Sequence, residues 1–228
     1  MMTSRPAVST GRGGLDAILG SLRLGDNVVW RVDRVDDYRS FVVPYVAAAL
    51  AAGRRVVYVR FARHPRLLEP DPRVTVHDLD AYRGFESFTV RLHTIIGQEG
   101  REAFYVFDCL SSLLDAWATD VMIGNFFAVT CPYLFELDTV AYFALERESH
   151  SFATVARIRA TTQLLIDLHH CPAGLYLHPL KVWERFSPTM FLPHRVSGSD
   201  NQSFQCGDVG RIDHSFSSLL DHRVGACE

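Results

Sequence analysis

The sequence predicts an α/β fold in which helices flank a doubly wound, mostly parallel sheet. Short apolar runs rich in Val, Tyr and Phe recur between residues 27 and 145. They are continuous rather than alternating, which is typical of strands buried on both faces of a parallel sheet. Segments with helical spacing separate these runs, and strands that alternate with helices favour βαβ units with right-handed crossovers.

The elements follow one another along the chain. Residues 1–13, rich in Ser, Thr, Arg and Gly, predict a flexible arm, and residues 14–22 predict a short helix closed by Gly20. The apolar runs predict strands at residues 27–32, 54–61, 73–79, 103–108 and 139–145. Helices are expected over residues 41–52, 84–97, 110–131 and 150–161.

The pattern changes after residue 162. Residues 163–170 and 175–186 are apolar runs joined by Cys-Pro-Ala-Gly, which predicts an antiparallel hairpin on the edge of the parallel sheet. From residue 196 the composition shifts to Ser, Gly, Asp, Asn and Gln. We therefore expect one domain over residues 14–195 and a polar tail or linker over 196–228, with an amphipathic helix at 213–223.

Composition excludes several classes of protein. The 228 residues are 48% hydrophobic and carry a net charge of −3, so nothing in the overall charge favours nucleic acid or an anionic membrane. Five cysteines without a Cys-x-x-Cys motif are typical of reduced thiols. The apolar runs are shorter than the roughly 20 residues that cross a bilayer. We expect a cytoplasmic protein that binds neither nucleic acid nor membrane.

Four stretches, taken in order, resemble the RecA-like ATPase fold and, within it, the KaiC-like family. Residues 9–30 resemble the Gly-Leu-Asp turn, short helix and first core strand, and residues 48–65 resemble the helix, Gly and second strand. Residues 103–114 are similar to the Walker B strand with its Asp-Ser-Leu ending, and 175–188 to the last strand. The resemblance covers about residues 9–194 and implies a RecA-like sheet, Mg-ATP as the ligand of the family and assembly into rings.

The loop that would hold the phosphates departs from the family at each key position. A Walker A loop needs Gly where backbone N–H groups converge on the phosphates, and the matching window, 32–39, has Val32 and Asp37 there. Tyr38 replaces the Lys that neutralises the phosphates, and Arg39 replaces the hydroxyl residue that holds magnesium. The sequence therefore predicts a vestigial nucleotide site with no catalytic residue and no cofactor.

The charges of this loop support the same prediction. Three carboxylates would crowd a polyphosphate, and three arginines offset their charge without rebuilding the backbone cradle. The acids are Asp33, Asp36 and Asp37, and the arginines are Arg31, Arg34 and Arg39.

Two further departures accompany the altered loop. Because proline is tolerated in the first turn of a helix and disruptive later, Pro44 predicts a helix that begins near Ser40 or Phe41, with its positive end displaced from any phosphate. After the second strand, Ala62 and Arg63 stand where the family places its catalytic Glu pair. The base that would activate water is absent from the sequence.

Two family positions keep a functional residue type. Asp108 ends its strand where the Walker B Asp would bind a metal ion, and Lys181 matches the Lys that reaches a neighbouring subunit's nucleotide. Each also has a purely structural interpretation. An Asp here is suited to capping the following helix, and a strand-edge Lys protects a sheet against aggregation.

Other groups of reactive side chains point less clearly to chemistry. His169, His170, Cys171 and His178 fall within ten residues, but neighbouring strand residues point to opposite faces and no zinc spacing is matched. Ser111 and its neighbours Cys109 and Ser112 lack a nucleophile elbow, and no His or acid is placed by sequence to activate them.

The stretch 125–152 is densely aromatic. It predicts either core or a protein-contact surface formed by Phe126, Phe127, Tyr133 and Phe135. Residues 130–145, together with residues 178–194, also resemble an accessory region of proteins related to phosphoenolpyruvate synthase or pyruvate phosphate dikinase.

Two functional hypotheses follow. The first is a degenerate KaiC-like domain that acts through protein contacts as a regulatory or scaffolding module and forms a homo-oligomer. The alternative is a nucleotide- or anion-binding protein that binds Mg-ATP or another anion in a remodelled site. That site would use Arg31, Arg34 and Arg39, with Asp108 for a metal ion and Lys181 from a neighbour. Fold alone does not choose between them, because function lies in the site.

Overall fold

The protein is built around a sheet of nine strands. A computed structural model describes residues 5–117, 119–172, 174–197 and 203–206. The strand order is β11-β10-β9-β8-β3-β7-β6-β4-β5. The parallel strands are β3 (Asn27–Val32), β4 (Val56–Arg60), β5 (Val74–Asp78), β6 (Phe104–Cys109), β7 (Val140–Glu146) and β8 (Leu164–Cys171). The antiparallel strands are β9 (Gly174–Val182), β10 (His194–Ser197) and β11 (Ser203–Cys206).

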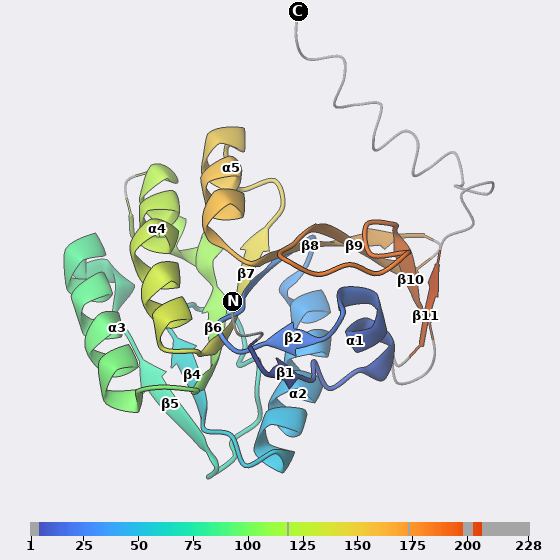
Figure 1. Cartoon of the computed structure of the whole chain (residues 1–228). Helices are drawn as coiled ribbons and strands as arrows, with labels where there is room; N and C mark the ends of the chain where they lie inside the picture. Colours follow the sequence, from blue (N-terminus) through green and yellow to red (C-terminus); the bar gives the residue numbers. More distant parts are fainter. Residues whose placement is uncertain (1–4, 118, 173, 198–202, 207–228) are drawn as a thin grey trace, which may run out of the picture.

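Helices cover both faces of the sheet (Figure 1). One face carries α3 (Phe85–Glu99), α4 (Val121–Glu136) and α5 (Phe152–Thr161), and the other carries α1 (Gly13–Leu19) and α2 (Val35–Ala51). The short helices η1 (Ala81–Arg83) and η2 (Leu110–Asp115) precede α3 and α4. The sequence prediction of an α/β fold with a mostly parallel sheet flanked by helices is confirmed.

A separate core fills each space between sheet and helices. In β3 successive side chains alternate, with Val28 and Trp30 in the core under α1 and α2 and Val29 in the core under α3, α4 and α5. All six residues of β3 are buried, as in a central parallel strand. Because both faces are covered, the polar groups at the carboxyl ends of the central strands are the part of the sheet left for binding.

The C-terminal hairpin forms as expected, but the sheet continues beyond it. β8 and β9 pair antiparallel from Leu164↔Val182 to Cys171↔Gly174. β10 then pairs with β9, and β11 pairs with β10. Parts of these two strands lie where a polar tail was expected from residue 196, whereas the helix expected at 213–223 lies outside the described residues.

The N-terminal segment is more ordered than a flexible arm. β1 (Ala7–Val8) pairs with β2 (Leu22–Arg23) in a small separate sheet. Thr10 and Arg12 are buried, and Arg12 leads directly into α1, which ends at Gly20 in the left-handed conformation. The prediction of a short helix closed by Gly20 is confirmed, and that of a flexible arm over residues 1–13 is wrong for its described part.

The structure also corrects the predicted start of α2. The helix begins at Val35, before Ser40, and Pro44 lies in its interior. An interior proline leaves the carbonyl four residues earlier without its helical hydrogen bond. The Arg12 guanidinium donates to this Ser40 carbonyl and lies over the Phe41 ring, 4.6 Å from the centroid. A buried side chain from another element thus replaces the missing donor.

Two further findings complete the description. In place of the single helix expected over 110–131, the structure has two helices: η2, which ends at Asp115, and α4, which begins at Val121. No helix in the described part of the chain is long and apolar enough to cross a membrane.

Candidate functional site

The candidate site lies at the carboxyl ends of β3, β7 and β8. From β3 the chain moves across the sheet through β4, β5 and β6, returns to β7 on one side of β3, and then places β8 on the other side. Ligands of open α/β sheets bind outside the carboxyl ends of the strands, where the strand order reverses. The position of β3 between β7 and β8 therefore predicts a binding site at this edge of the sheet.

The connection from β3 to α2 is short. β3 ends at Val32 and α2 begins at Val35, so only Asp33 and Arg34 lie between them. A phosphate cradle needs several successive backbone N–H groups aimed at one anion. A two-residue link does not provide such a loop.

Charged side chains fill the space beside this link. They come from β3, the start of α2, the end of β7 and the end of β8, and we call them the carboxyl-edge cluster: Arg31, Asp33, Arg34, Asp37, Arg147, Asp167, His169 and His170. The sequence placed Arg31 and Arg34 here. It gave no signal for Arg147 or Asp167, because their approach depends on the neighbouring positions of β7 and β8.

The buried part of the cluster is a chain of ion pairs. Arg31 Nη1 lies 3.3 Å from Asp167 Oδ1, and the two side chains are 7% and 5% exposed. Arg147 bridges the next two acids, with Nε 2.7 Å from Asp33 Oδ1 and Nη1 3.9 Å from Asp167 Oδ2. These arginines therefore already have carboxylate partners, supplied by the protein itself.

The two histidines lie on either side of Asp33. The backbone N–H of His170 donates to Asp33 Oδ2 over 2.8 Å, and its ring contacts Arg34 Nη2. His169 is within hydrogen-bond distance of Arg147, and burial together with this arginine lowers the pKa of His169 to about 4. His169 is consequently a neutral ring near pH 7.

The outer part of the cluster joins the helix α2 to β8. Asp37 Oδ1 lies 3.4 Å from Arg34 Nη2 and 3.6 Å from His170 Nδ1. Asp37 is 9% exposed, whereas Arg34 is 56% exposed. The position that a Walker A loop fills with Gly is occupied here by a buried, ion-paired acid.

Tyr38 and Arg39 do not belong to this cluster. Tyr38 is completely buried under the sheet, and its hydroxyl donates to the carbonyl of Phe107 over 3.3 Å. Arg39 points to the loop after β4, where Nη2 lies 2.7 Å from Glu69 Oε1 and Nε donates to the Leu67 carbonyl. Neither side chain is directed at the space where phosphates would lie.

Asp108 holds the loop that follows β4. Its Oδ1 accepts a hydrogen bond from the Tyr58 hydroxyl at 2.5 Å, and its Oδ2 accepts from the backbone N–H groups of Phe61 and Ala62 at 3.0 Å each. The residue is 0% exposed. Burial and the adjacent carboxylate raise the pKa of Tyr58. The carboxylate thus neither caps the following helix nor faces an open metal site.

Lys181 is engaged within its own chain. Its Nζ donates to the carbonyl of Arg159 over 2.6 Å and to that of Ala160 over 3.4 Å. These carbonyls belong to the last turn of α5, where a positive charge is favourable. Burial lowers the pKa of Lys181. The structure therefore gives this lysine a helix-capping contact that the sequence did not indicate.

A serine and a histidine meet at the same edge, which the sequence reasoning missed. Ser111 Oγ lies 2.7 Å from His150 Nε2 and accepts the backbone N–H of Glu146 over 2.8 Å. Burial lowers the pKa of His150, so the ring is neutral near pH 7. Ser111 is only 6% exposed and is held by both neighbours, an arrangement that fixes the end of β7 against η2.

The two remaining sequence hypotheses differ in outcome. Phe126 and Phe127 are completely buried, so this part of the aromatic stretch is core and not a contact surface. The four residues proposed as a metal site do not gather: His169 and His170 join the carboxyl-edge cluster, and His178 lies within hydrogen-bond distance of the Phe191 carbonyl. Within the described ranges, no group of three or more His, Cys, Asp or Glu is placed to hold a metal ion.

Chemically, this edge of the sheet is a set of mutually neutralised charges. Such an arrangement fixes three strands and a helix relative to one another, and an incoming anion would meet acids as well as arginines.

Comparison with known proteins found no matching family model, and no curated protein matches the chain.

Proposed function

We propose that the chain is a RecA-like domain, related to the KaiC-like family, that does not hydrolyse ATP and acts through contacts with other proteins as a regulatory or scaffolding module. The doubly wound sheet with β3 at the switch point supports the family assignment. Ala62 and Arg63 after β4, where the family has its Glu pair, support the loss of hydrolysis.

The observation that carries this proposal is the carboxyl-edge cluster. A triphosphate at the end of β3 would approach Asp33, Asp37 and Asp167, and like charges repel, most strongly at Asp37 and Asp167, which are buried. Binding would also require Arg31 and Arg147 to leave their carboxylate partners. Breaking a buried ion pair by removing one partner costs about 3–5 kcal/mol.

Nucleotide titrations test this part of the proposal. We expect no rise in melting temperature and no calorimetric signal with Mg-ATP, ADP or GTP at about 1 mM. A ligand with Kd below about 100 μM would stabilise the fold by more than about 1 kcal/mol at that concentration. Saturable binding of Mg-ATP that is lost in Arg31→Gln and kept in the surface control Arg23→Gln would overturn it.

Two exposed aromatic side chains support a role in protein contacts. Phe152 at the start of α5 is 89% exposed, and Phe186 in the loop after β9 is 81% exposed. A partner that covered these side chains would remove their apolar surface from water, which is favourable. We expect the chain to self-associate, and we assign its contacts to these two side chains, which follow opposite ends of the parallel strands.

Light scattering after size-exclusion chromatography tests the contact. Phe152→Ser with Phe186→Ser should shift the chain to monomer while its melting temperature stays within about 2 °C, because neither side chain is part of the core. Val43→Ser, 47% exposed on α2, is the matched control. A monomeric wild-type chain, or a double variant with unchanged mass, would refute self-association through these residues.

A further inference from the structure

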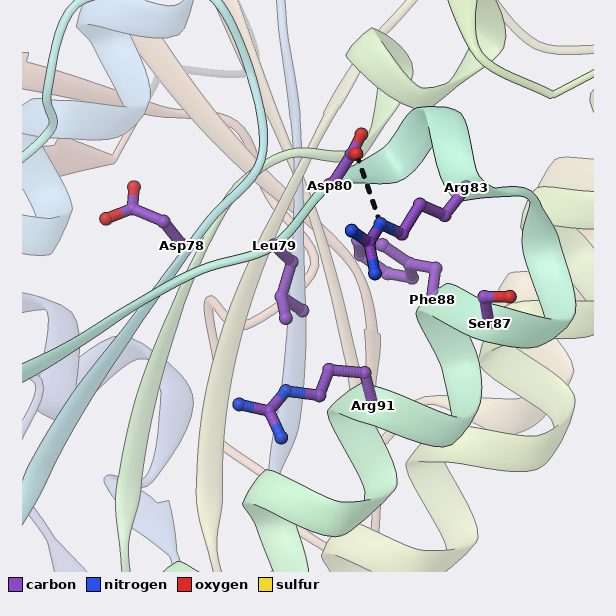
Figure 2. Close-up of a pocket in the computed structure, with 7 residues that line it drawn as sticks. All are labelled: Asp78, Leu79, Asp80, Arg83, Ser87, Phe88 and Arg91. Atoms are coloured by element: carbon purple, nitrogen blue, oxygen red, sulfur yellow. Dashed lines mark ion pairs between the residues drawn. The ribbon is translucent and has the colours of Figure 1, made fainter.

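A surface pocket lies at the edge of the sheet farthest from the C-terminal hairpin. It has a volume of about 360 Å³ and lies between the end of β5 and the first half of α3. Its lining residues are Asp78, Leu79, Asp80, Arg83, Ser87, Phe88 and Arg91 (Figure 2). Its volume falls in the range of small-molecule sites, about 300–1,000 Å³.

The floor of the pocket is apolar, with Leu79 partly exposed and Phe88 almost completely buried. Phe88 is 2% exposed and packs against Phe61 and Trp117, with ring centroids 5.5 and 5.4 Å apart. Leu79 lies beside it at the end of β5, between the two arginine side chains in the view of Figure 2. The apolar floor is therefore preformed and does not depend on a ligand.

Two arginines supply the charge of the pocket. Arg83 comes from η1 and Arg91 from α3, and Gly84, with φ 90°, makes the sharp turn between these helices. Figure 2 shows both side chains extending from their helices toward Leu79. Guanidinium groups bind carboxylate and phosphate through two parallel hydrogen bonds.

The acids of the pocket are already engaged. Asp80 accepts the Tyr82 backbone N–H over 3.0 Å and lies 3.5 Å from Arg83 Nε. Asp78 lies 3.9 Å from Arg60, and its carboxylate points away from both pocket arginines in Figure 2.

Arg91 is left without an acidic partner in the described part of the chain. On a helix the neighbouring positions are three and four residues away, and here they are Ser87, Phe88, Thr94 and Ile95, none of which is acidic. An arginine above an apolar floor, with no carboxylate of its own, is the arrangement that binds the oxyanion of a ligand with an apolar body.

We propose that this pocket binds a small organic anion, in which a phosphate or carboxylate group contacts Arg91 and Arg83 and an apolar body rests on Leu79 and Phe88. The site is separate from the carboxyl-edge cluster and independent of the function proposed above.

Titrations of the full chain with four probes test the proposal. Inorganic phosphate, phenyl phosphate, acetate and benzoate are added while amide chemical shifts are followed by NMR. We expect saturable shifts confined to residues 78–91, with phenyl phosphate and benzoate binding at least about threefold more tightly than the probes without a ring, because each ring covers apolar surface. The better binding series, phosphate or carboxylate, identifies the oxyanion.

Variants of Arg91 decide whether the pocket itself is responsible. Arg91→Gln should weaken the binding of phenyl phosphate about tenfold or more. Arg91→Lys should weaken it less, because lysine keeps the positive charge and loses only the two parallel donors of the guanidinium. Arg157→Gln, an exposed arginine in the middle of α5, is the matched control and should change nothing. The proposal fails if no probe saturates by about 10 mM, if shifts spread over arginines across the surface, or if Arg91→Gln binds as the wild type does.

Discussion

Replacing Asp108 distinguishes a structural carboxylate from a metal ligand. In the structure this side chain accepts one hydrogen bond from Tyr58 and two from the backbone amides of Phe61 and Ala62, and it is completely buried. If the role is structural, Asp108→Ala must destabilise the fold in the absence of any ligand. If the role is catalytic, stability should change little and a metal-dependent activity should disappear.

The size of the effect follows from the donors left behind. Asp108→Ala leaves one buried and two partly buried donors without an acceptor, at about 1–3 kcal/mol each when fully buried, whereas removing a buried carboxylate returns several kcal/mol of desolvation. We expect a net loss of about 3–5 kcal/mol. Asp108→Asn keeps one acceptor oxygen for the two amides, but it alters the contact with Tyr58 and removes the charge near Arg60 and His64, so it should lose about 1–2 kcal/mol.

Urea unfolding followed by circular dichroism and tryptophan fluorescence measures both losses. Asp115→Ala, an exposed acid in η2, is the control and should change the free energy of unfolding by less than about 0.5 kcal/mol. A loss below about 1 kcal/mol for Asp108→Ala would refute the structural role. The same would follow if Asp108→Asn were as damaging as Asp108→Ala.

Three other predictions concern stability. Because the pKa of His169 is lowered to about 4, the unfolded chain binds a proton between pH 6.5 and 4 that the folded chain does not. The free energy of unfolding should therefore be at its full value above about pH 6.5 and fall by up to about 3 kcal/mol as the pH drops to 4. Urea unfolding at several pH values measures this slope, and His169→Phe should flatten it. Gly11→Ala should cost more than about 2 kcal/mol in the same assay, because φ is 80° and the new Cβ would collide with the Pro44 carbonyl; an unchanged midpoint would contradict this contact. Arg185→Met should cost about 3–5 kcal/mol, because it removes the partner of the buried Asp26 carboxylate, whose oxygens lie 2.7 and 2.9 Å from the guanidinium. If the ion pair is responsible, adding Asp26→Leu should cancel this loss, whereas additive losses from the two substitutions would refute it.

The strands were predictable because their signal is local. Burial on both faces requires a continuous apolar run, and the runs at 27–32 and 139–145 differ from β3 and β7 by no more than one residue at either end. The hairpin of β8 and β9 was equally visible, because Pro and Gly mark its turn. Strand order was not encoded in this way, since it depends on which runs pack side by side.

The start of α2 was not predictable from its own residues. A proline in the interior of a helix is disfavoured by the rule used for Pro44, and the rule fails here because Arg12, more than 25 residues away in the sequence, donates to the freed Ser40 carbonyl. Residues 203–206 were missed for a related reason. A polar composition predicts a tail unless a strand such as β10 offers its edge for pairing.

The carboxyl-edge cluster could be recognised only from the sequence and the strand positions together. The sequence placed Val32 and Asp37 where the family it resembles has Gly, with arginines close by, and this was the basis for predicting the loss of a phosphate cradle. It did not show that Asp167 and Arg147 come from β8 and β7 to complete the pairing with Arg31 and Asp33. Those contacts depend on the positions of β7 and β8 on either side of β3.

The cluster also explains how Arg31 and Arg147 can be largely buried at this edge of the sheet. Buried cations require anions beside them, because an uncompensated charge in a protein interior costs several kcal/mol. In a nucleotide-binding domain the ligand's phosphates supply those anions, and here Asp33 and Asp167 supply them within the chain. A fold that carries its own anions at this edge holds β3, β7 and β8 together without a ligand.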